Sequence, residues 1–360
     1  MKILYVDLYY DYGVRKRGLN HIGQDGFIKG FQNLGHDLDV FYYDDYLQNH
    51  DQLQTDLIQK ADLCKPDLIF FLLFTDQFQI ETLDHLKANY CTIAWFGDDN
   101  WRFEPYSKYL ANHFTWCVTT EKHAIPKYHQ IGQTNVILSQ WAAIDSYPVP
   151  VKKDQFLHDV SFVGAISPYR QWFIHYLEKH NIQVAVFGIG WPNGQVTSSE
   201  MNEVFMHSKI NLNISNSESY DLRYLLHIPL RARGLFSGSM KEKLRPMVAK
   251  GRELRKIFTK GKGVKNSGSL KARNFEIPFF GGFQLSYYFP GVEDFFTIGK
   301  EIACYSNIDE AILQINYYLE NEEQRREIAE KSHQVAINNH GYQHRLEVIL
   351  SSLQVDLSES

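Results

Sequence analysis

The sequence predicts an α/β protein made of two doubly wound domains, each with a parallel sheet between layers of helices. Its length of 360 residues exceeds what one typical core needs, so two domains are expected. Short apolar runs of strand type alternate with helical patterns, and this alternation starts again in the second half of the chain. Hydrophobic residues make up 44% and charged residues 22%, which is usual for a globular protein.

The first half contains a regular series of strand and helix patterns. Strands are expected at 2–8, 37–43, 67–73, 91–96, 115–119 and 135–138, and helices at 22–34, 53–61 and 78–88. Gly35 can end the first helix, and Pro66 breaks the chain before the third strand. That strand is a continuous apolar run, as in strands that are covered on both faces. These repeated units predict a parallel sheet.

A linker is expected where two alternate prolines, Pro148 and Pro150, stiffen the chain and remove ladder hydrogen bonds. The second half then repeats the pattern, with strands expected at 159–163, 182–187, 210–214 and 283–285, and helices at 169–180, 272–282 and within 307–352. Another helix begins near residue 198, with Ser199 as its N-cap candidate.

The expected domains are 1–147, 148–340 and a C-terminal helix and tail at 341–360, with a basic insertion at about 216–270. Two consecutive doubly wound domains place a cleft between the carboxyl ends of their strands. Folds of this kind bind ligands at those ends, so we expect the functional residues to follow the strands.

The strongest functional signal is the segment 271–285. In this segment Glu276 enters a helix shortly after Arg273, and Gly281 and Gly282 close the helix. A carboxylate there can accept two hydrogen bonds from a ribose diol, while Arg273 and helix N–H groups bind a diphosphate. The glycines let the next strand approach closely. From spacing alone, the alternative is an acid in the first turn of a helix, stabilised by the helix dipole.

An ordered series of short motifs runs along most of the chain. It consists of Ala94-Trp95-Phe96-x-Asp98-Asp99-x-Trp101-x-Phe103, Phe162-Val163-Gly164, Phe187-Gly188-x-Gly190-Trp191, Ser208-Lys209-Ile210-x-Leu212-Asn213-Ile214-Ser215, Arg273-x-Phe275-Glu276-Ile277, Gly281-Gly282-Phe283, Phe296-x-x-Gly299-x-Glu301-Ile302, Tyr317-Tyr318-Leu319, Ile328-Ala329 and Gly341-Tyr342-x-x-Arg345. This series resembles the CgeB-like, spore-maturation type family of glycosyltransferases. The resemblance implies the GT-B fold, in which two Rossmann-like domains face one another across a cleft.

The resemblance also implies roles for single residues. Glu276 matches the acid that binds the donor ribose in related retaining enzymes, whereas the position of a second acid, which touches the donor sugar, is Gly268. Gly164 and Arg170 match parts of a phosphate grip, although Ala165 stands where that grip has an arginine. The implied reaction moves a sugar from a nucleoside-diphosphate sugar to a hydroxyl acceptor, with retention of configuration and without a metal or other cofactor.

Further donor-site candidates are small residues that follow the strands. Gly188 and Gly190 end the second strand of the second half and can let backbone groups read a nucleotide base, although a simple tight turn explains them equally well. Ser215 ends the third strand on the same side. Gly13 lies in the basic loop 9–21, which covers the donor phosphates in GT-B architecture, and a solvated loop is the alternative.

Three residues of the first half are candidates for catalysis. Asp98 and Asp99 follow an expected strand, where a carboxylate can orient or deprotonate an acceptor hydroxyl. The alternatives are an N-capping turn and an Asp-x-Asp type metal site, and the resemblance argues against the metal. His21 precedes the first helix and can act in catalysis or face the acceptor, although a lone histidine is more often structural.

Charge is distributed unevenly along the chain. The net charge is −5, but residues 231–273 carry 14 Lys and Arg against two acids, so this stretch has +12 and the rest −17. Apolar residues recur there at helical spacing, which indicates a basic amphipathic helix over 231–265. The first interpretation is a solvated insertion packed on its own domain. The functional alternatives are contact with an anionic membrane surface and, after it, binding of nucleic acid.

The start of the chain shows no signal peptide, and no apolar run is long enough to span a bilayer. We therefore expect a cytoplasmic protein, peripheral at the inner membrane face if the basic stretch binds lipid. The expected function is sugar transfer in surface glycan or glycoconjugate synthesis. Gly268 and Ala165 prompt the alternative of a non-catalytic carbohydrate- or nucleotide-binding protein, and the basic stretch prompts a transferase that modifies nucleic acid.

Overall fold

The computed structural model describes residues 1–149, 155–215, 221–231 and 268–359. The chain divides into two compact units, Met1–Pro148 with Asn339–Ser360, and Val149–Asn338. The basic stretch 231–265, and with it the expected membrane or nucleic-acid partner, lies almost entirely outside the described residues. No helix in the described ranges has the length and apolar character needed to cross a membrane.

The first unit is built on a six-stranded parallel sheet with the order β2-β1-β3-β4-β5-β6. Its strands are β1 Lys2–Asp7, β2 Asp37–Tyr42, β3 Leu68–Leu72, β4 Cys91–Phe96, β5 Trp116–Thr119 and β6 Val136–Leu138. The order reverses between β1 and β3, which pair directly from Ile3 opposite Leu68 onward. The predicted doubly wound sheet is therefore confirmed, and its switch point lies between β1 and β3.

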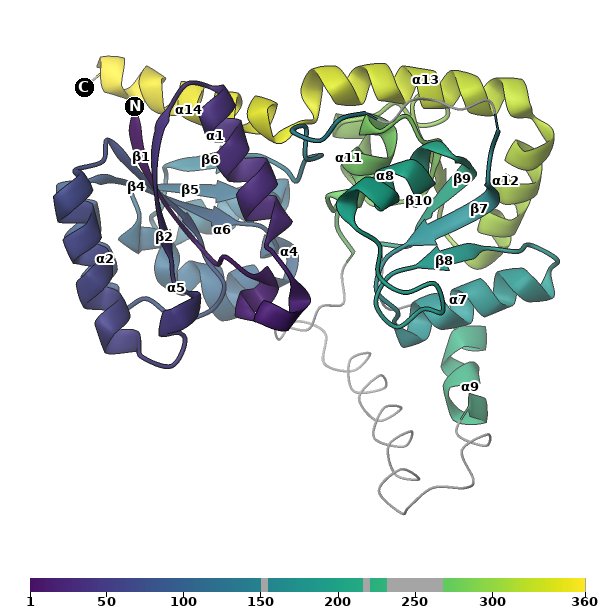
Figure 1. The fold of residues 1–360 in the computed structure, drawn as a ribbon, viewed down its shortest axis with the longest axis horizontal. Helices are drawn as coiled ribbons and strands as arrows, with labels where there is room; N and C mark the ends of the chain where they lie inside the picture. The colour runs from purple at the N-terminus through teal and green to yellow at the C-terminus, as the bar shows by residue number, and fades with distance from the viewer. Residues whose placement is uncertain (150–154, 216–220, 232–267, 360) are drawn as a thin grey trace. The chain divides into compact units, whose positions relative to one another are not determined.

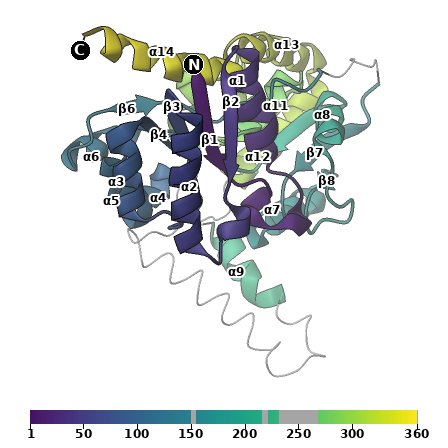
Figure 2. The ribbon, with the colours of Figure 1, turned by 60° about the vertical axis from the view of Figure 1, so that its left-hand side comes forward.

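Helices cover both faces of this sheet. One face carries α2 His50–Cys64, α3 Ile80–Asn89, α4 Asp99–Arg102, α5 Lys108–Leu110 and α6 Ile125–Gln130. Figure 2 shows α2 and α3 side by side on it. The other face carries α1 Lys29–Asn33, the π-helical turn η3 Ile22–Ile28 before it, and the terminal helix α14 Tyr342–Glu359. The two apolar layers bury each central strand on both sides, which explains the continuous apolar run at β3.

The terminal helix α14 belongs to the first unit although the sequence between it and residue 148 forms the second. Ala143 pairs with Gly341, and the N–H of Gln343 donates to the Asp145 carboxylate at 3.0 Å. A Cβ on Gly341 would lie 2.1 Å from Asp145, so this approach requires glycine. Tyr342 then packs against Phe27 with ring centroids 4.9 Å apart, which anchors α14 in the core.

The second unit has a five-stranded parallel sheet with the order β11-β10-β9-β7-β8. Its strands are β7 His158–Val163, β8 Ala185–Phe187, β9 Ser208–Asn213, β10 Gln284–Tyr287 and β11 Ala303–Tyr305. The sequence patterns did not predict β11, which is three residues long. The switch point of this sheet lies between β7 and β9.

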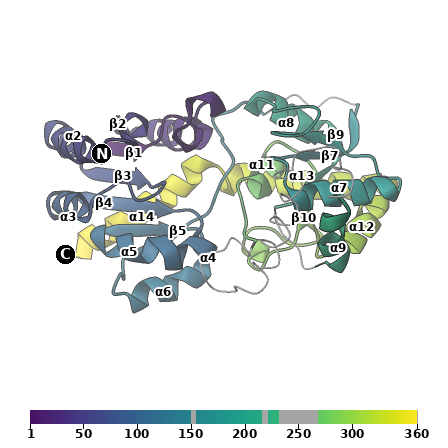
Figure 3. The same cartoon turned by 90° about the horizontal axis from the view of Figure 1, so that it is seen from below.

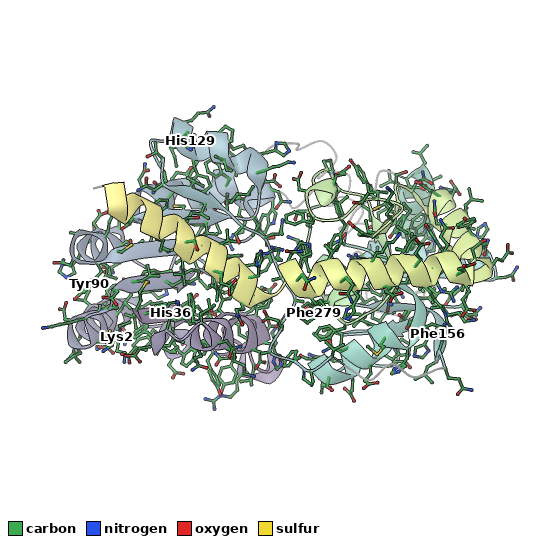
Figure 4. All side chains as sticks on the ribbon, turned by 90° about the horizontal axis from the view of Figure 1, so that it is seen from above. Lys2, His36, Tyr90, His129, Phe156 and Phe279 are labelled. Atoms are coloured by element: carbon green, nitrogen blue, oxygen red, sulfur yellow. The ribbon has the colours of Figure 1, made fainter. Side chains whose placement is uncertain are left out.

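The helices of the second unit are α7 Pro168–Lys179, α8 Ser198–Met206, α9 Leu222–Arg231, α11 Arg273–Phe279, α12 Ile308–Glu320 and α13 Glu322–Asn339. Figure 3 shows α7, α9 and α12 together, and Arg223 of α9 forms an ion pair with Asp309 of α12 at 2.7 Å. Figure 4 labels Phe156 and Phe279 near α13, whose His333 hydrogen bonds to the carbonyl of Pro278 at 3.1 Å. Helix α13 is thus fixed along the second unit.

One local expectation was wrong. Helix α8 begins at Ser198, and its N-cap is Thr197 instead of Ser199. The Thr197 side chain accepts from the N–H of Glu200, and the Glu200 carboxylate accepts from the N–H of Thr197. This reciprocal capping box needs an acid three residues after the cap, and Glu200 stands at that distance from Thr197 only.

Candidate functional site

The carboxyl ends of β7, β8 and β9 carry the glycine motifs of the second unit. Gly188 has φ +124°, and a Cβ there would lie 2.4 Å from the carbonyl oxygen of Gly164. Gly190 has φ +90°, and a Cβ there would lie 2.3 Å from Ile166. The Trp191 indole N–H donates to the Gly164 carbonyl at 2.9 Å and closes the turn. Gly188 is thus required by the close approach of the Gly164 backbone, and Gly190 by that of the Ile166 side chain, where β8 ends beside β7.

Arg170 bridges the two strands of the switch point. It lies in the first turn of α7, whose N-cap is Ser167, and its Nε donates to the carbonyl of Ile214 at 2.9 Å. Its Nη1 donates to the carbonyl of Ala165 at 2.9 Å. Within the described residues, Nη2 donates to no partner, so part of the guanidinium stays available for an anion. The side chain therefore both fixes the loops and supplies positive charge.

Glu276 and Arg273 form an ion pair in the first turn of α11. Nη1 of Arg273 donates to Oε2 of Glu276 at 2.5 Å, and the guanidinium lies 5.1 Å from the Phe205 ring centroid of α8. Glu276 is 8% exposed. Its other oxygen, Oε1, accepts no hydrogen bond in the described part of the chain. One oxygen of this carboxylate is thus paired and the other is free to accept hydrogen bonds from a ligand.

Charge and burial act together on this group of side chains. Burial raises the pKa of Glu276 above its usual value, and the attraction of Arg273 offsets part of that rise. Burial also lowers the pKa of Arg170, and repulsion from Arg273 lowers it further. Arg170 lies between the ends of β7 and β9, and the ion pair of Arg273 and Glu276 forms the first turn of α11, which precedes β10.

The structure does not bring every donor-site candidate to this place. Gly281 and Gly282 lie at the other end of α11, before β10 begins. Gly281 has φ +79° and ends the helix, while a Cβ on Gly282 would lie 2.8 Å from the carbonyl oxygen of Phe205. Their geometry gives them a role in packing. Ser215 does follow β9, and its buried hydroxyl has no hydrogen-bond partner among the residues that the structure describes.

Gly268 marks a difference from the pattern that the resemblance implies. A Cβ at this position would lie 1.6 Å from Cε1 of Phe289, a residue that follows β10. Phe289 is 6% exposed, so its ring fills the space that a side chain at position 268 would need. The site therefore lacks a carboxylate here and has no room for one without movement of the ring.

In the first unit, His21 belongs to a hydrogen-bonded group next to η3. Its Nδ1 lies 2.7 Å from Oδ2 of Asp25, and the Tyr147 hydroxyl donates to the same carboxylate oxygen at 2.5 Å. Lys29 pairs with the other oxygen of Asp25 at 2.6 Å. Burial raises the pKa of Asp25, but hydrogen bonds from His21, Lys29 and Tyr147 outweigh it and lower the pKa below its usual value. Asp25 thus stays ionised beside an exposed imidazole.

The two adjacent acids after β4 differ sharply in their surroundings. Asp99 is 1% exposed, and its carboxylate accepts hydrogen bonds from the hydroxyls of Ser107, Thr119 and Tyr128 at 2.5, 2.7 and 2.7 Å. Burial raises its pKa, which these hydrogen bonds partly oppose. Asp99 therefore ties three segments together inside the unit. Asp98 is partly exposed at the N-cap position of α4, and its side chain does not cap the helix.

Asp7, which the sequence patterns did not single out, lies at the carboxyl end of β1. It is 3% exposed, and burial raises its pKa to about 7, although hydrogen bonds from the Tyr5 hydroxyl, the Leu8 N–H and the Asn20 amide oppose the rise. Asn20 immediately precedes His21. A Cβ on Gly23 would lie 2.3 Å from Asp7, so the π-helical turn packs directly on this carboxyl. The signal in the sequence was a single acid at the end of an apolar strand.

Gly13 and the basic residues of the loop after β1 serve local structure. Gly13 has φ +67°, and its Cβ would meet the flexible end of Leu47 at 2.6 Å. Arg17 pairs with Asp11 at 2.7 Å and lies 4.5 Å from the centroid of the Tyr12 ring. Arg15 lies 5.4 Å from the centroid of the Tyr10 ring. In this structure these two arginines hold aromatic rings in place. The described residues contain no group of three His, Cys, Asp or Glu side chains arranged to hold a metal.

Comparison with known proteins gives one family match. Residues 248–351 match the model of the family described as glycosyl transferase-like. This stretch includes α11, β10, β11, α12 and α13, and so contains Arg273 and Glu276. No curated protein sequence matches the chain.

Solved structures share the fold at low sequence identity. A sucrose-phosphate synthase from Thermosynechococcus elongatus is 8% identical with a TM-score of 0.61, and each chain is covered completely. A glycosyltransferase from Rickettsia africae is 11% identical with a TM-score of 0.60, over 100% of this chain and 99% of that one. Anabaena Alr3699/HepE in complex with UDP-glucose is 12% identical with a TM-score of 0.52, over 99% and 100%.

These likenesses establish the fold. The two parallel-sheet, Rossmann-like units match the architecture of GT-B glycosyltransferases along the whole chain, as the sequence predicted. The family match adds a glycosyl transferase-like segment at the place where Arg273 and Glu276 meet. Together, the family match and the shared fold support a glycosyltransferase.

Proposed function

We propose that the protein transfers a sugar from a nucleoside-diphosphate sugar to a hydroxyl acceptor, and that the donor binds at the carboxyl ends of the second sheet. The observations that carry this proposal are the buried ion pair of Glu276 with Arg273 and the position of Arg170 at the switch point. HepE, which shares the fold, was solved with UDP-glucose bound. A dianionic leaving group and a ribose diol are the two features of such a donor that these side chains match.

Each side chain has a distinct task in this proposal. Oε1 of Glu276 accepts hydrogen bonds from the ribose hydroxyls, while Arg273 keeps the carboxylate ionised in spite of its burial. The free N–H groups of Arg170 and Arg273 stabilise the diphosphate as negative charge develops on it.

On the acceptor side, we propose that His21 acts on the acceptor hydroxyl and that Asp25 orients the imidazole. The hydrogen bond of 2.7 Å fixes Nδ1 toward Asp25, so Nε2 is the nitrogen that remains for the acceptor proton. Asp98 is the second candidate, because it is partly exposed after β4. Asp99 supports this site from within, since its carboxylate is already held by three hydroxyls.

The finer assignments rest on the sequence resemblance. We propose that the protein belongs to the CgeB-like group, retains the anomeric configuration and acts in surface glycan or glycoconjugate synthesis in the cytoplasm. The basic stretch 231–265 is proposed as an anionic-membrane contact on its charge alone. The configuration of the product, read by NMR of the transferred sugar, decides retention, and an inverted product would remove that assignment.

A thermal-shift screen with UDP, GDP, CMP and dTDP tests donor binding. A nucleotide present at 100 times its dissociation constant should add about 2.7 kcal/mol to the unfolding free energy. Transfer is then measured with sugar nucleotides of the selected base, using Glu276→Ala as the variant. Equal binding and turnover in wild type and variant would remove Glu276 from the site.

A non-catalytic nucleotide- or carbohydrate-binding protein is the alternative, and one observation favours it. Phe289 fills the space beside Gly268, so no acid can contact the donor sugar from that position. Under this alternative, nucleotides bind but neither transfer nor hydrolysis of any sugar nucleotide in a broad panel exceeds the rate without protein. Turnover that depends on Arg170 and Glu276 would exclude it.

A further inference from the structure

A group of aromatic rings lies at the switch point of the first sheet, in the loops that follow β1 and β3. Tyr12 follows β1 and Phe74 follows β3, and their ring centroids lie 5.6 Å apart at a steep angle of 77°. Tyr106 is the third member, because its hydroxyl donates to the carbonyl of Thr75 at 2.6 Å. We call Tyr12, Phe74 and Tyr106 the aromatic platform.

Arginines hold the rings of this platform in place. Arg17 lies 4.5 Å from the centroid of the Tyr12 ring, and Arg102 lies 4.2 Å from the centroid of the Tyr106 ring. Nη2 of Arg102 also donates to the carbonyl of Phe74 at 2.6 Å, which connects the segments that carry Phe74 and Tyr106. The rings are thus fixed before any ligand arrives.

Tyr12 is exposed and has an unfavourable backbone conformation. Its side chain is 58% exposed. Its φ of 53° and ψ of 27° lie in the left-handed region, which a tyrosine rarely adopts. An exposed ring on a left-handed backbone lowers the stability of the fold, so its presence here indicates a binding surface.

We propose that the aromatic platform binds the acceptor and that this acceptor is a carbohydrate. The exposed ring of Tyr12, held by the partly buried Phe74 and by Arg17, can stack on the apolar face of a sugar ring. The neighbouring pair of Arg17 and Asp11, joined at 2.7 Å with side chains 40% and 38% exposed, offers donors and acceptors to the sugar hydroxyls. A lipid chain would desolvate that pair without replacing its hydrogen bonds to water, so the chemistry favours a polyhydroxylated ligand. This inference rests on the proposed function, since it names the acceptor of that reaction.

Binding of the wild-type full chain to an array of immobilised neutral oligosaccharides tests the platform without a donor. Wild type and Tyr12→Phe should bind the same glycans, and Tyr12→Ala should lose at least tenfold in affinity. Tyr12→Gly removes the ring but relieves the left-handed conformation, so it should lose binding while its melting temperature stays equal or rises. Tyr109→Ala is the matched control, because Tyr109 is also exposed, at 63%, with Lys108 5.0 Å from its ring centroid.

Three outcomes would overturn the proposal. They are no glycan binding by wild type, equal glycan binding by Tyr12→Ala and Tyr12→Phe, or Tyr12-dependent binding to phosphatidylglycerol vesicles in place of glycans. Nucleotide binding to the same variants separates this inference from the donor assignment. If nucleotides bind and glycan binding does not depend on Tyr12, only the aromatic platform is contradicted. If glycan binding depends on Tyr12 and no nucleotide binds, only the donor assignment is contradicted.

Discussion

The carboxyl ends of the two sheets have the same kind of switch point and carry different side chains. In the second unit, Arg170 and Arg273 accompany a single acid, Glu276, between glycines that allow close backbone approach. In the first unit, the buried acid Asp7 accepts a hydrogen bond from Asn20 of the loop after β1. In the same loop, Arg15 and Arg17 lie over the rings of Tyr10 and Tyr12. The same topology thus offers an anion site in one unit and, by our inference, a sugar-stacking site in the other.

The difference teaches what the positive charges do. All four arginines bond an acid or a carbonyl and lie over a ring: Arg170 lies 5.4 Å from the Phe162 ring centroid and Arg273 5.1 Å from that of Phe205, as Arg17 and Arg102 lie over Tyr12 and Tyr106. The difference is in the acid: Arg273 pairs with Glu276, whose side chain is 10% exposed, and Arg17 with Asp11, whose side chain is 38% exposed. A count of basic residues in the sequence treats these arginines alike.

The largest loss of unfolding free energy is expected for Gly188→Ala in the second unit. This substitution should cost about 3 kcal/mol, because Gly188 has φ +124° and the added Cβ would lie 2.4 Å from the carbonyl oxygen of Gly164. Gly194→Ala is the control, since Gly194 has φ +71° but no atom within 4 Å of the added Cβ, and it should cost about 1 kcal/mol. Urea unfolding measures both values. Equal losses of unfolding free energy would show that the close approach of the Gly164 carbonyl does not constrain position 188.

His21→Ala should lower turnover about 100-fold, or about 2.7 kcal/mol, and leave nucleotide binding unchanged, because it removes a general base and no donor contact. Asp25→Asn should lower turnover less, and the double variant should resemble His21→Ala alone. His113→Ala is the control. Nδ1 of His113 lies 2.6 Å from the Asp84 carboxylate in a similar pair, and this pair is not at the carboxyl ends of the strands. A comparable loss of turnover in His113→Ala would contradict the assignment of His21.

Asp7 should make the first unit less stable as pH rises. Its pKa is raised in the folded state to about 7, so the folded protein holds a proton that the unfolded chain has released above about pH 4. Stability contributed by that proton is present at low pH and is lost up to about pH 7, with a slope of at most about 1.4 kcal/mol per pH unit. Unfolding measured from pH 5 to 8 should show this slope in wild type and lose it in Asp7→Asn. Asp25→Asn, whose parent pKa is lowered, should keep the slope.

Much of the fold could be predicted because strands and helices reveal themselves by local periodicity. The strand at Cys91–Phe96 was predicted to the residue, and the glycines at 188 and 190 were predicted to follow the second strand of the second half. The partners of Arg170 could not be predicted, since Ile214 lies 44 residues away and the bond forms to a backbone carbonyl. The return of α14 to the first unit likewise depends on a contact between Asp145 and Gly341 that has no local signature.

The candidate site was predictable in part for the same reason. Glu276 and Arg273 are three residues apart on one helix, so their pairing follows from helical spacing. Gly281 and Gly282 connect α11 to the start of β10, so they lie at the amino end of that strand, opposite the carboxyl ends where ligands bind. Asp7 and Tyr12 acquire their properties from burial and backbone conformation, and neither is visible in composition or spacing.

The preference of the protein for a nucleotide with a ribose diol tests directly whether Glu276 binds the ribose of the donor. The nucleoside diphosphate selected by the thermal-shift screen and its 2′,3′-dideoxy form are titrated calorimetrically into wild type, Glu276→Gln and the control Glu327→Gln. Glu327 also forms an ion pair, with Lys331 at 2.5 Å, on the exposed surface of α13.

Wild type and Glu327→Gln should prefer the ribonucleotide by about 30-fold, or about 2 kcal/mol, because Glu276 accepts hydrogen bonds from both hydroxyls. Glu276→Gln should bind the two ligands nearly equally. If the preference for the ribonucleotide survives in Glu276→Gln, Glu276 does not bind the ribose and the account of the donor site is contradicted.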